Sequence, residues 1–195
     1  MINSHVILAS GWILFCVLHS AFASSRCKNW FQEHMGKQSR FYRLYYTIFA
    51  LISFAAVIID LLLVPSYRLF RPNPFTIICG TIVSSIGLMI MAICIGKYFM
   101  QLSGLKGLIE EETRNELMVT GIHQFVRHPL YSGTFVFIWG LLITIPSLSL
   151  LIVDTIVTVY TVIGLRFEEQ KLEKEFGTAY RAYKQTVPML IPKLG

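Results

Sequence analysis

The chain has 195 residues, of which 54% are hydrophobic and only 14% are charged, whereas typical soluble domains carry about 25% charged residues. The mean hydropathy is +0.60, and the apolar residues come in long blocks, so the composition excludes an ordinary water-soluble globular domain. The net charge of +6 does not require nucleic acid as a partner, because the placement of Lys and Arg around the apolar blocks accounts for it.

The apolar blocks predict an all-α, polytopic membrane protein with about five transmembrane helices. A helix needs about 20 apolar residues to cross the hydrocarbon core, and the first three blocks each fit one crossing. The fourth is too long for one crossing and is interrupted by Pro146-Ser147. Proline ends or kinks a helix because it lacks the N–H group, so we expect a tight helical hairpin there; one long kinked helix is the alternative. The predicted membrane helices are 5–23, 44–64, 75–95, 130–145 and 147–165.

The distribution of basic residues predicts the orientation. No basic residue precedes the first block, so we interpret it as a retained helix rather than a cleaved signal peptide. With the N-terminus outside, every Lys and Arg except Arg68 and Arg71 falls on the cytosolic side, in agreement with the positive-inside rule. We therefore expect a single multi-pass membrane domain over 1–195, located in the plasma membrane if the cell is prokaryotic. Its C-terminus and its two larger polar segments, 96–129 and 166–195, are expected to be cytosolic.

The four cysteines do not predict a metal centre. They lie at Cys16, Cys27, Cys79 and Cys94, with no CxxC pair among them. Three fall in apolar blocks, and structural zinc sites need several closely spaced Cys and His ligands. We expect neither a metal nor a disulfide framework.

The segment before the predicted hairpin concentrates groups that can bind a ligand. Pro129 suits the first turn of a helix, where free backbone N–H groups and the positive dipole end attract anions. The carboxylate of an amino-acid-derived cofactor is one such anion. The alternative is that Arg127 and His128 extend to the lipid headgroups while Tyr131 belongs to the aromatic belt.

A second candidate segment follows the last apolar block, where Arg166 precedes the pair Glu168-Glu169. Two carboxylates at the end of a membrane helix are suited to binding ribose hydroxyls or a cationic amino group. The alternative is a solvated helix whose charges pair along its surface.

Together the two segments resemble the C-terminal pattern of the isoprenylcysteine carboxyl methyltransferase family, whose wider group includes the phospholipid methyltransferases. The pattern reads G-x5-RHPxY, a helical hairpin, EExxL, FGxxYxxY and VPxxxP, and it covers about residues 113–192. The matching residues are Gly121, Arg127-His128-Pro129-Leu130-Tyr131, Glu168-Glu169, Leu172, Phe176-Gly177, Tyr180, Tyr183, Val187-Pro188 and Pro192.

The resemblance implies an enzyme that uses S-adenosylmethionine and releases S-adenosylhomocysteine. It implies that the methyl acceptor is a lipid or lipid-like molecule that enters from the bilayer, while the cofactor enters from the cytosol. The cofactor pocket is expected on the cytosolic side, between the segment before the hairpin and the last helix. The positions that match cofactor contacts are Glu116, Leu117, Met118, Gly121, His123, Arg127, His128, Pro129, Leu130, Tyr131 and Glu168.

The resemblance also points to catalytic roles for Arg166 and Glu169. An arginine near the start of the final helix holds the acceptor carboxylate in the family, and Arg166 is the nearest candidate, although its spacing to Glu168 differs from that of the isoprenylcysteine enzymes. A carboxylate acceptor needs no general base, and positioning then supplies most of the catalysis. An amine or thiol acceptor must lose a proton, for which His123, His128 or Glu169 would serve. The sequence leaves these cases open.

Two other functions compete with methyl transfer. Membrane sterol reductases are similar in the same C-terminal region but bind a nicotinamide nucleotide, and they are much longer. A membrane scaffold or transporter subunit without catalytic activity is the other alternative, but the charged motifs lie at one end of the helices only. Binding of S-adenosylmethionine, of NADPH or of neither discriminates the three.

Overall fold

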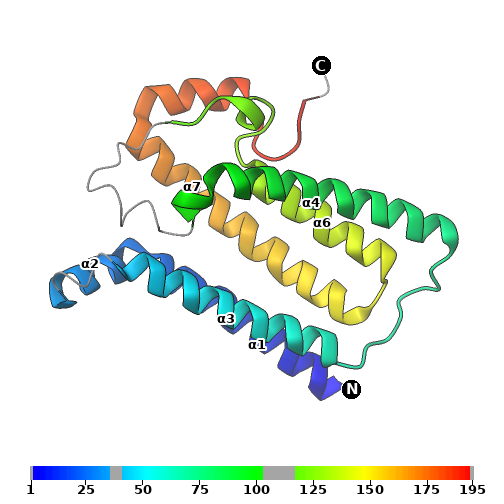
Figure 1. The fold of residues 1–195 in the computed structure, drawn as a ribbon. Coiled ribbons are helices and arrows are strands. Elements are labelled where there is room, and N and C mark those ends of the chain that lie inside the picture. Colours follow the sequence, from blue (N-terminus) through cyan, green and yellow to red (C-terminus); the bar gives the residue numbers. More distant parts are fainter. Residues whose placement is uncertain (1, 36–40, 103–116, 194–195) are drawn as a thin grey trace. The chain divides into compact units, whose positions relative to one another are not determined.

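The computed structural model describes residues 2–35, 41–102 and 117–193, and in this part of the chain the regular structure is entirely helical (Figure 1). The predicted all-α fold is therefore confirmed. The chain divides into two compact units. Unit 1 comprises Met1–Arg68, Tyr98–Thr113 and Ser147–Ile156; unit 2 comprises Leu69–Lys97, Arg114–Pro146 and Val157–Gly195.

Unit 1 is built on two long apolar helices, α1 (Ile2–Ala23) and α3 (Tyr42–Leu63), which lie side by side (Figure 1). Aromatic side chains fill the seam between them. The ring of Trp12 meets that of Phe54 edge-on at a centroid distance of 6.1 Å, and Phe22 meets Phe49 at 5.0 Å. Edge-to-face pairs at these distances are favourable, so they fix the pairing of the two helices.

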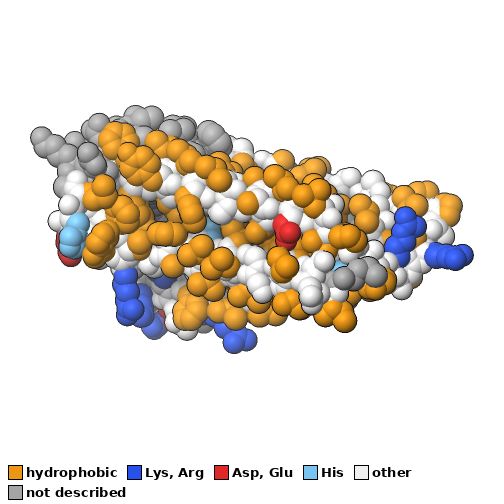
Figure 2. All heavy atoms as spheres, turned by 90° about the horizontal axis from the view of Figure 1, so that it is seen from below, with side chains coloured by type: hydrophobic (Ala, Val, Ile, Leu, Met, Phe, Trp, Pro, Cys, Tyr) orange, Lys and Arg blue, Asp and Glu red, His pale blue; other side chains and the backbone are white. Residues whose placement is uncertain are grey.

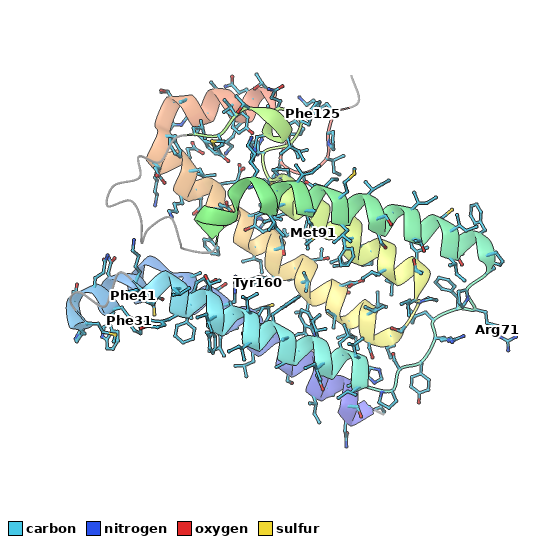
Figure 3. The ribbon with its side chains drawn as sticks, viewed as in Figure 1. Phe31, Phe41, Arg71, Met91, Phe125 and Tyr160 are labelled. Carbon is cyan, nitrogen blue, oxygen red and sulfur yellow. The ribbon has the colours of Figure 1, made fainter. Side chains whose placement is uncertain are left out.

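A short helix, α2 (Ser25–Met35), connects them and was not predicted from the sequence. Ser24 starts it, because its hydroxyl accepts a hydrogen bond from the backbone N–H of Cys27 at 3.3 Å, as helix-capping serines do. The ring of Phe31 packs against that of Tyr42 at 4.8 Å, which ties α2 to the start of α3. Figure 3 labels Phe31 on α2 and Phe41 just before α3.

In unit 2, the backbones of α4 (Pro74–Leu102) and α6 (Pro129–Thr144) come very close where the two helices cross. Asn73 and Thr76 start α4 with reciprocal bonds of 2.9 and 3.0 Å, a capping arrangement with proline at the first helical position. A Cβ added at Gly87 would lie only 2.3 Å from the backbone nitrogen of Phe137. The two backbones therefore approach as closely as they do because glycine occupies the crossing, as in many membrane helix pairs.

The predicted hairpin is present. After α6 ends at Thr144, residues 145–147 turn the chain and α7 (Leu148–Thr186) begins. Trp139 on α6 donates a hydrogen bond to Thr158 on α7 at 3.2 Å, so the two helices lie next to each other beyond the turn. Pro146, which lacks an N–H group, sits where no helical hydrogen bond is needed.

α7 is interrupted at Gly177, which adopts φ 55° and ψ −123°, a conformation that glycine reaches without the penalty a side chain would bring. Along an unbroken helix, residues eleven positions apart would be about 16 Å apart. Instead the hydroxyl of Tyr180 reaches the carboxylate of Glu169 at 2.6 Å. The break at Gly177 therefore folds the last part of α7 back beside the part that precedes it (Figure 1).

Four helices of the described residues are long and apolar enough to cross a membrane: α1, α3, α4 and α7. α6 is apolar but shorter, at 16 residues. Many large hydrophobic side chains on these helices are exposed, among them Leu62 at 77% and Ile82 at 55%. Figure 2 shows a face over which hydrophobic side chains are widely spread and few acidic ones appear. Because soluble proteins do not expose apolar surface on this scale, the chain is a polytopic membrane protein.

Candidate functional site

The local sequence sets the backbone on which the site is built. Gly121 has φ +67°, a left-handed conformation that L side chains rarely adopt, and it begins the short 3-10 helix η2 (Gly121–Gln124). Exposed Phe125 follows η2 (Figure 3). The chain then reaches α6, where Pro129 occupies the first helical turn and His128 is the residue before it.

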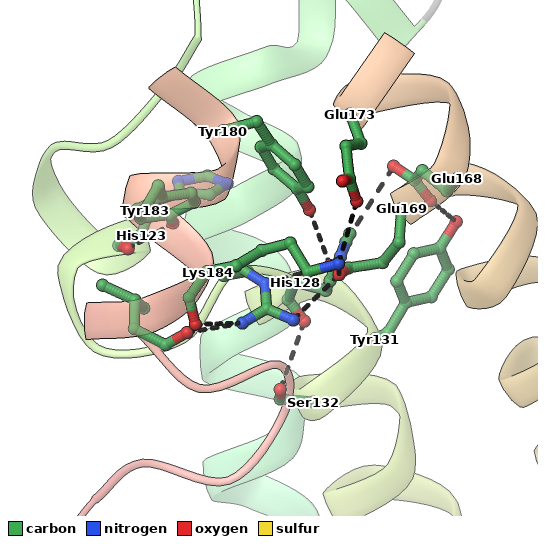
Figure 4. Close-up of polar contacts among 12 residues, drawn as sticks. His123, His128, Tyr131, Ser132, Glu168, Glu169, Glu173, Tyr180, Tyr183 and Lys184 are labelled. Carbon is green, nitrogen blue, oxygen red and sulfur yellow. Dashed lines mark hydrogen bonds and ion pairs between the residues drawn. The ribbon is translucent and has the colours of Figure 1, made fainter. Parts of the chain in front are cut away.

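At the centre of the site is the carboxylate of Glu169, which is only 5% exposed. Arg127 binds it with two hydrogen bonds, from Nε to Oε1 at 3.0 Å and from Nη2 to Oε2 at 2.9 Å. The hydroxyl of Tyr180 donates to Oε1 at 2.6 Å, and Nε2 of His128 lies 2.7 Å from the same oxygen. Figure 4 shows His128, from just before α6, together with Glu169 and Tyr180, from the two parts of α7.

The surroundings of Glu169 keep it ionised. Burial by itself disfavours the charged form, but the hydrogen bonds from Arg127, Tyr180 and His128 outweigh burial and lower the pKa of Glu169 to about 2. The pKa of Tyr180 is raised, by burial and then by the neighbouring carboxylate. A two-pronged arginine–carboxylate contact is among the strongest polar contacts in proteins. Glu169 is therefore ionised at neutral pH and holds its neighbours in place.

The same arginine fixes the C-terminal segment 187–190. Nη1 of Arg127 donates to the carbonyl oxygen of Val187 at 2.5 Å. The backbone N–H of Arg127 donates to the carbonyl oxygen of Pro188 at 2.9 Å. The backbone N–H of His128 donates to the carbonyl oxygen of Met189 at 3.1 Å. Ser132, one turn into α6, donates from its hydroxyl to Leu190 at 2.7 Å. The segment after α7 is thus bound along the start of α6.

Glu168 lies in a different setting from its neighbour. Its side chain is 42% exposed, and its Oε2 accepts a hydrogen bond from the hydroxyl of Tyr131 at 3.1 Å. Its Oε1 is 4.0 Å from Nδ1 of His128, which is too long for a hydrogen bond. His128 therefore lies between the two carboxylates, with Nε2 on the buried one and Nδ1 toward the accessible one (Figure 4).

A cationic group lies beside η2. A Cβ built on Gly121 would stand 3.1 Å from Nζ of Lys97, which comes from the end of α4. The pKa of His123 is lowered, mainly by burial and then by the positive charges of Lys97 and His128. The carbonyl oxygen of His123 accepts a hydrogen bond from Tyr183 at 2.6 Å, so the returning part of α7 also anchors η2.

The structure brings most of the predicted site residues into this region. Glu169 and Arg127 form its centre, with His128, Tyr131 and Glu168 beside them, while Arg166 is exposed on α7. Glu116 lies outside the described residues. The other predicted contacts lie on η2, on the stretch before it and at the start of α6: Leu117, Met118, Gly121, His123, Pro129 and Leu130.

Some residues of the site were not predicted as site residues, among them Tyr180, Lys184 and Lys97. Tyr180 donates to Glu169 at 2.6 Å, Lys184 places its Nζ 3.6 Å from the same carboxylate, and Lys97 lies beside Gly121. The FGxxYxxY motif contains Tyr180 and was a usable signal, because a tyrosine just after a helix-breaking glycine can fold back onto the helix. Lys97 carries no local signal in the sequence.

Comparison with known proteins places the chain among methyltransferase relatives. It is 30% identical over 186 residues to methanethiol S-methyltransferase 1 of Bradyrhizobium diazoefficiens, covering 92% of this chain and 64% of that protein. Methanethiol S-methyltransferase of Crocosphaera subtropica is 34% identical over 86 residues, covering 44% of this chain and 33% of that protein. Protein-S-isoprenylcysteine O-methyltransferase B of Arabidopsis thaliana is 29% identical over 85 residues, 43% of each chain.

The chain thus spans 64% of the length of the first of these relatives and less of the others. No solved structure matches it significantly. The family model described as NnrU protein matches residues 7–193, almost the whole chain. Because a protein-S-isoprenylcysteine O-methyltransferase is among the relatives, the resemblance to the isoprenylcysteine carboxyl methyltransferases is confirmed, and the chain belongs to the NnrU protein family.

Proposed function

We propose that this protein is a membrane methyltransferase that transfers a methyl group from S-adenosylmethionine to an acceptor delivered through the bilayer. The observation that carries the proposal is the pairing of a buried, fully bound carboxylate, Glu169, with an accessible one, Glu168, at the RHPxY motif. The first holds the site together, and the second remains available to a ligand. The methyltransferase names of the relatives support the same reading.

The residues present fit S-adenosylmethionine, which carries a carboxylate at one end and cationic and ribose hydroxyl groups elsewhere. Glu168, already oriented by Tyr131, is suited to the ribose hydroxyls or the amino group. The ammonium of Lys97 stands beside the backbone of Gly121, and a cation in this place is suited to the cofactor's carboxylate. Exposed Met118 and Val119 offer apolar surface beside this stretch. When bound, the cofactor would supply an activated methyl group.

For the acceptor side we propose a lipophilic molecule that reaches the site from the membrane lipids, at the cytosolic face of a plasma membrane. The exposed guanidinium of Arg166 is suited to holding an acidic acceptor group. The names of the bacterial relatives favour a second acceptor class, a thiol. A reporter fused after Gly195 that functions only in the cytosol tests the proposed orientation, and a silent reporter would refute it.

Binding measured by calorimetry on detergent-purified protein tests the proposed function. We expect S-adenosylhomocysteine to bind with micromolar affinity and NADPH not to bind. Glu168→Gln should weaken S-adenosylhomocysteine binding at least tenfold, because it removes the accessible negative charge. Glu175→Gln, an exposed position on the same helix, is the matched control and should leave binding unchanged. Binding of NADPH instead would assign the protein to the reductases, and binding of neither by folded protein would refute both.

A further inference from the structure

Methyl transfer to a thiol requires a general base, because an ordinary thiol is mostly protonated at neutral pH. The thiolate, not the thiol, is the effective nucleophile. The sequence offers three residues for this role: His123, His128 and Glu169. Their surroundings in the structure differ enough to choose among them.

Glu169 is not suited to accept a proton. Both of its oxygens already accept hydrogen bonds from Arg127, and Oε1 also accepts from Tyr180. Protonation would break a buried ion pair that involves an arginine whose side chain is only 7% exposed, and doing so is costly. His123 is also a weak base, because burial and the charges of Lys97 and His128 lower its pKa.

His128 has the geometry of a base held by a carboxylate. Glu169 is ionised and has no proton to give, so the hydrogen in its 2.7 Å contact with His128 belongs to Nε2. In the neutral ring this leaves the lone pair on Nδ1, the atom that points toward accessible Glu168 at 4.0 Å. A carboxylate that fixes the tautomer of a histidine and stabilises its charged form is the arrangement found in serine hydrolase triads.

We propose that the acceptor is a thiol, that Nδ1 of His128 takes its proton, and that Glu169 acts as the positioning residue for His128. The inference rests on the proposed function and names its acceptor class. The thiol S–H bond breaks and the proton moves to Nδ1. The acceptor sulfur forms a bond to the methyl carbon as the bond from that carbon to the sulfonium sulfur breaks. The products are a methyl thioether and S-adenosylhomocysteine, and His128 then releases its proton to water.

The charges around His128 favour this cycle. Two carboxylates from α7 face the ring, and they stabilise the imidazolium that forms when the ring takes a proton. Arg127 and Lys184 are fully engaged with carboxylates and carbonyls of the same cluster. His128 is only 6% exposed, so the protein groups of this cluster hold its ring in place. Among the described residues, the cluster that holds the His128 ring contains these titratable and charged groups: Arg127, Tyr131, Glu168, Glu169, Tyr180 and Lys184. His123 also interacts electrostatically with His128.

His128→Gln tests the inference, because a glutamine amide can still donate to Glu169 but offers no basic nitrogen. Wild-type and variant proteins are assayed with an alkanethiol, which is largely protonated at pH 7, and an arenethiol, which ionises more readily. We expect methylation of the alkanethiol to fall 100-fold or more, on the order of what a general base contributes. Methylation of the arenethiol should fall less than about tenfold, because less of its barrier depends on the base. Equal losses for both thiols would overturn the inference.

Two further readouts separate a base from a structural residue. The affinity of the variant for S-adenosylhomocysteine is measured by calorimetry, and both thiols are assayed at saturating S-adenosylmethionine, so that weaker cofactor binding is separated from loss of the base; a fall in methylation that disappears at saturating cofactor would mean that His128 binds the cofactor instead and would overturn the inference. The loss of alkanethiol methylation caused by His128→Gln should shrink as the pH rises, because the thiol itself ionises at high pH and no longer needs the base. A loss of the same size at every pH would also contradict the inference.

The choice of acceptors distinguishes failure of this inference from failure of the proposed function. Butanethiol and a long-chain alkanethiol separate a small thiol from a lipid-like one, and N-acetyl-S-farnesylcysteine offers a carboxylate as the acceptor group. Methylation of the carboxylate alone, unaffected by His128→Gln, would overturn the thiol inference and leave the methyltransferase proposal intact. Wild-type protein that binds no S-adenosylhomocysteine would overturn both.

Discussion

Replacing Glu169 by alanine should destabilise the protein far more than any substitution of an exposed acidic residue. The change leaves the guanidinium of Arg127, whose side chain is 7% exposed, without its partner. It also removes the acceptor for the hydroxyl of Tyr180 and for Nε2 of His128. Breaking a buried ion pair on one side costs about 3–5 kcal/mol. For a chain of this size, each kcal/mol lowers the melting temperature by about 2–4 °C, so we expect a fall of roughly 10 °C.

The assay is thermal unfolding in detergent, followed by tryptophan fluorescence, at matched protein concentration and scan rate. Glu173→Ala is the control, because Glu173 lies one turn further along α7 and also binds two cations, Arg181 at 2.9 Å and Lys184 at 3.2 Å. Those pairs are more exposed, where water screens them, so the melting temperature should hardly change. Comparable falls in melting temperature in the two variants would refute the idea that the Glu169 cluster stabilises the protein because it is buried.

A double substitution sharpens this prediction. Arg127→Met together with Glu169→Met removes both charges and leaves apolar side chains of similar length. Buried ion pairs replaced as a unit often leave stability nearly unchanged. The double variant should therefore be more stable than Glu169→Ala, although it loses the arginine bonds to segment 187–190. A double variant less stable than the single one would show that these backbone contacts, rather than the unpaired charge, carry the stability.

Three further predictions concern the charge of Glu169, the crossing of α4 and α6, and the contacts of Arg127 with segment 187–190. Because the pKa of Glu169 falls from 4.5 to about 2 on folding, its ionised form contributes roughly 3 kcal/mol above pH 4.5. That contribution disappears as the pH falls toward 2, so the difference in melting temperature between wild type and Glu169→Gln should shrink over this range. Gly87→Ala should lower the melting temperature strongly, because its Cβ would lie 2.3 Å from backbone on α6, whereas Gly164→Ala, with nothing within 4 Å, should not. Arg127→Lys should expose the C-terminal segment 187–190 to protease, because a lysine cannot reproduce the fork of bonds; unchanged digestion would contradict this.

The sequence by itself determined the long apolar helices and most of the residues of the site, but not the short helix α2. Blocks of apolar residues must form helices in a membrane, because lipid offers no hydrogen-bond partner to the backbone. Pro146 marks the turn of the hairpin, and Gly177, where α7 breaks, stands in the FGxxYxxY motif. The RHPxY and EE motifs identified the residues that form the site. These features follow from the runs of apolar residues and from the backbone conformations that proline and glycine allow. Both can be identified in a sequence.

Only the tertiary structure decided what the two adjacent glutamates do. Successive side chains on a helix point about 100° apart. The local sequence does not indicate whether Glu168 or Glu169 faces the interior. Glu169 is the buried centre, where it accepts hydrogen bonds from Arg127, 42 positions earlier in the chain, and from Tyr180, folded back by Gly177. Glu168 accepts a hydrogen bond from Tyr131, and its side chain stays 42% exposed. The roles of the pair thus depend on contacts between distant segments, which exist only once the chain has folded.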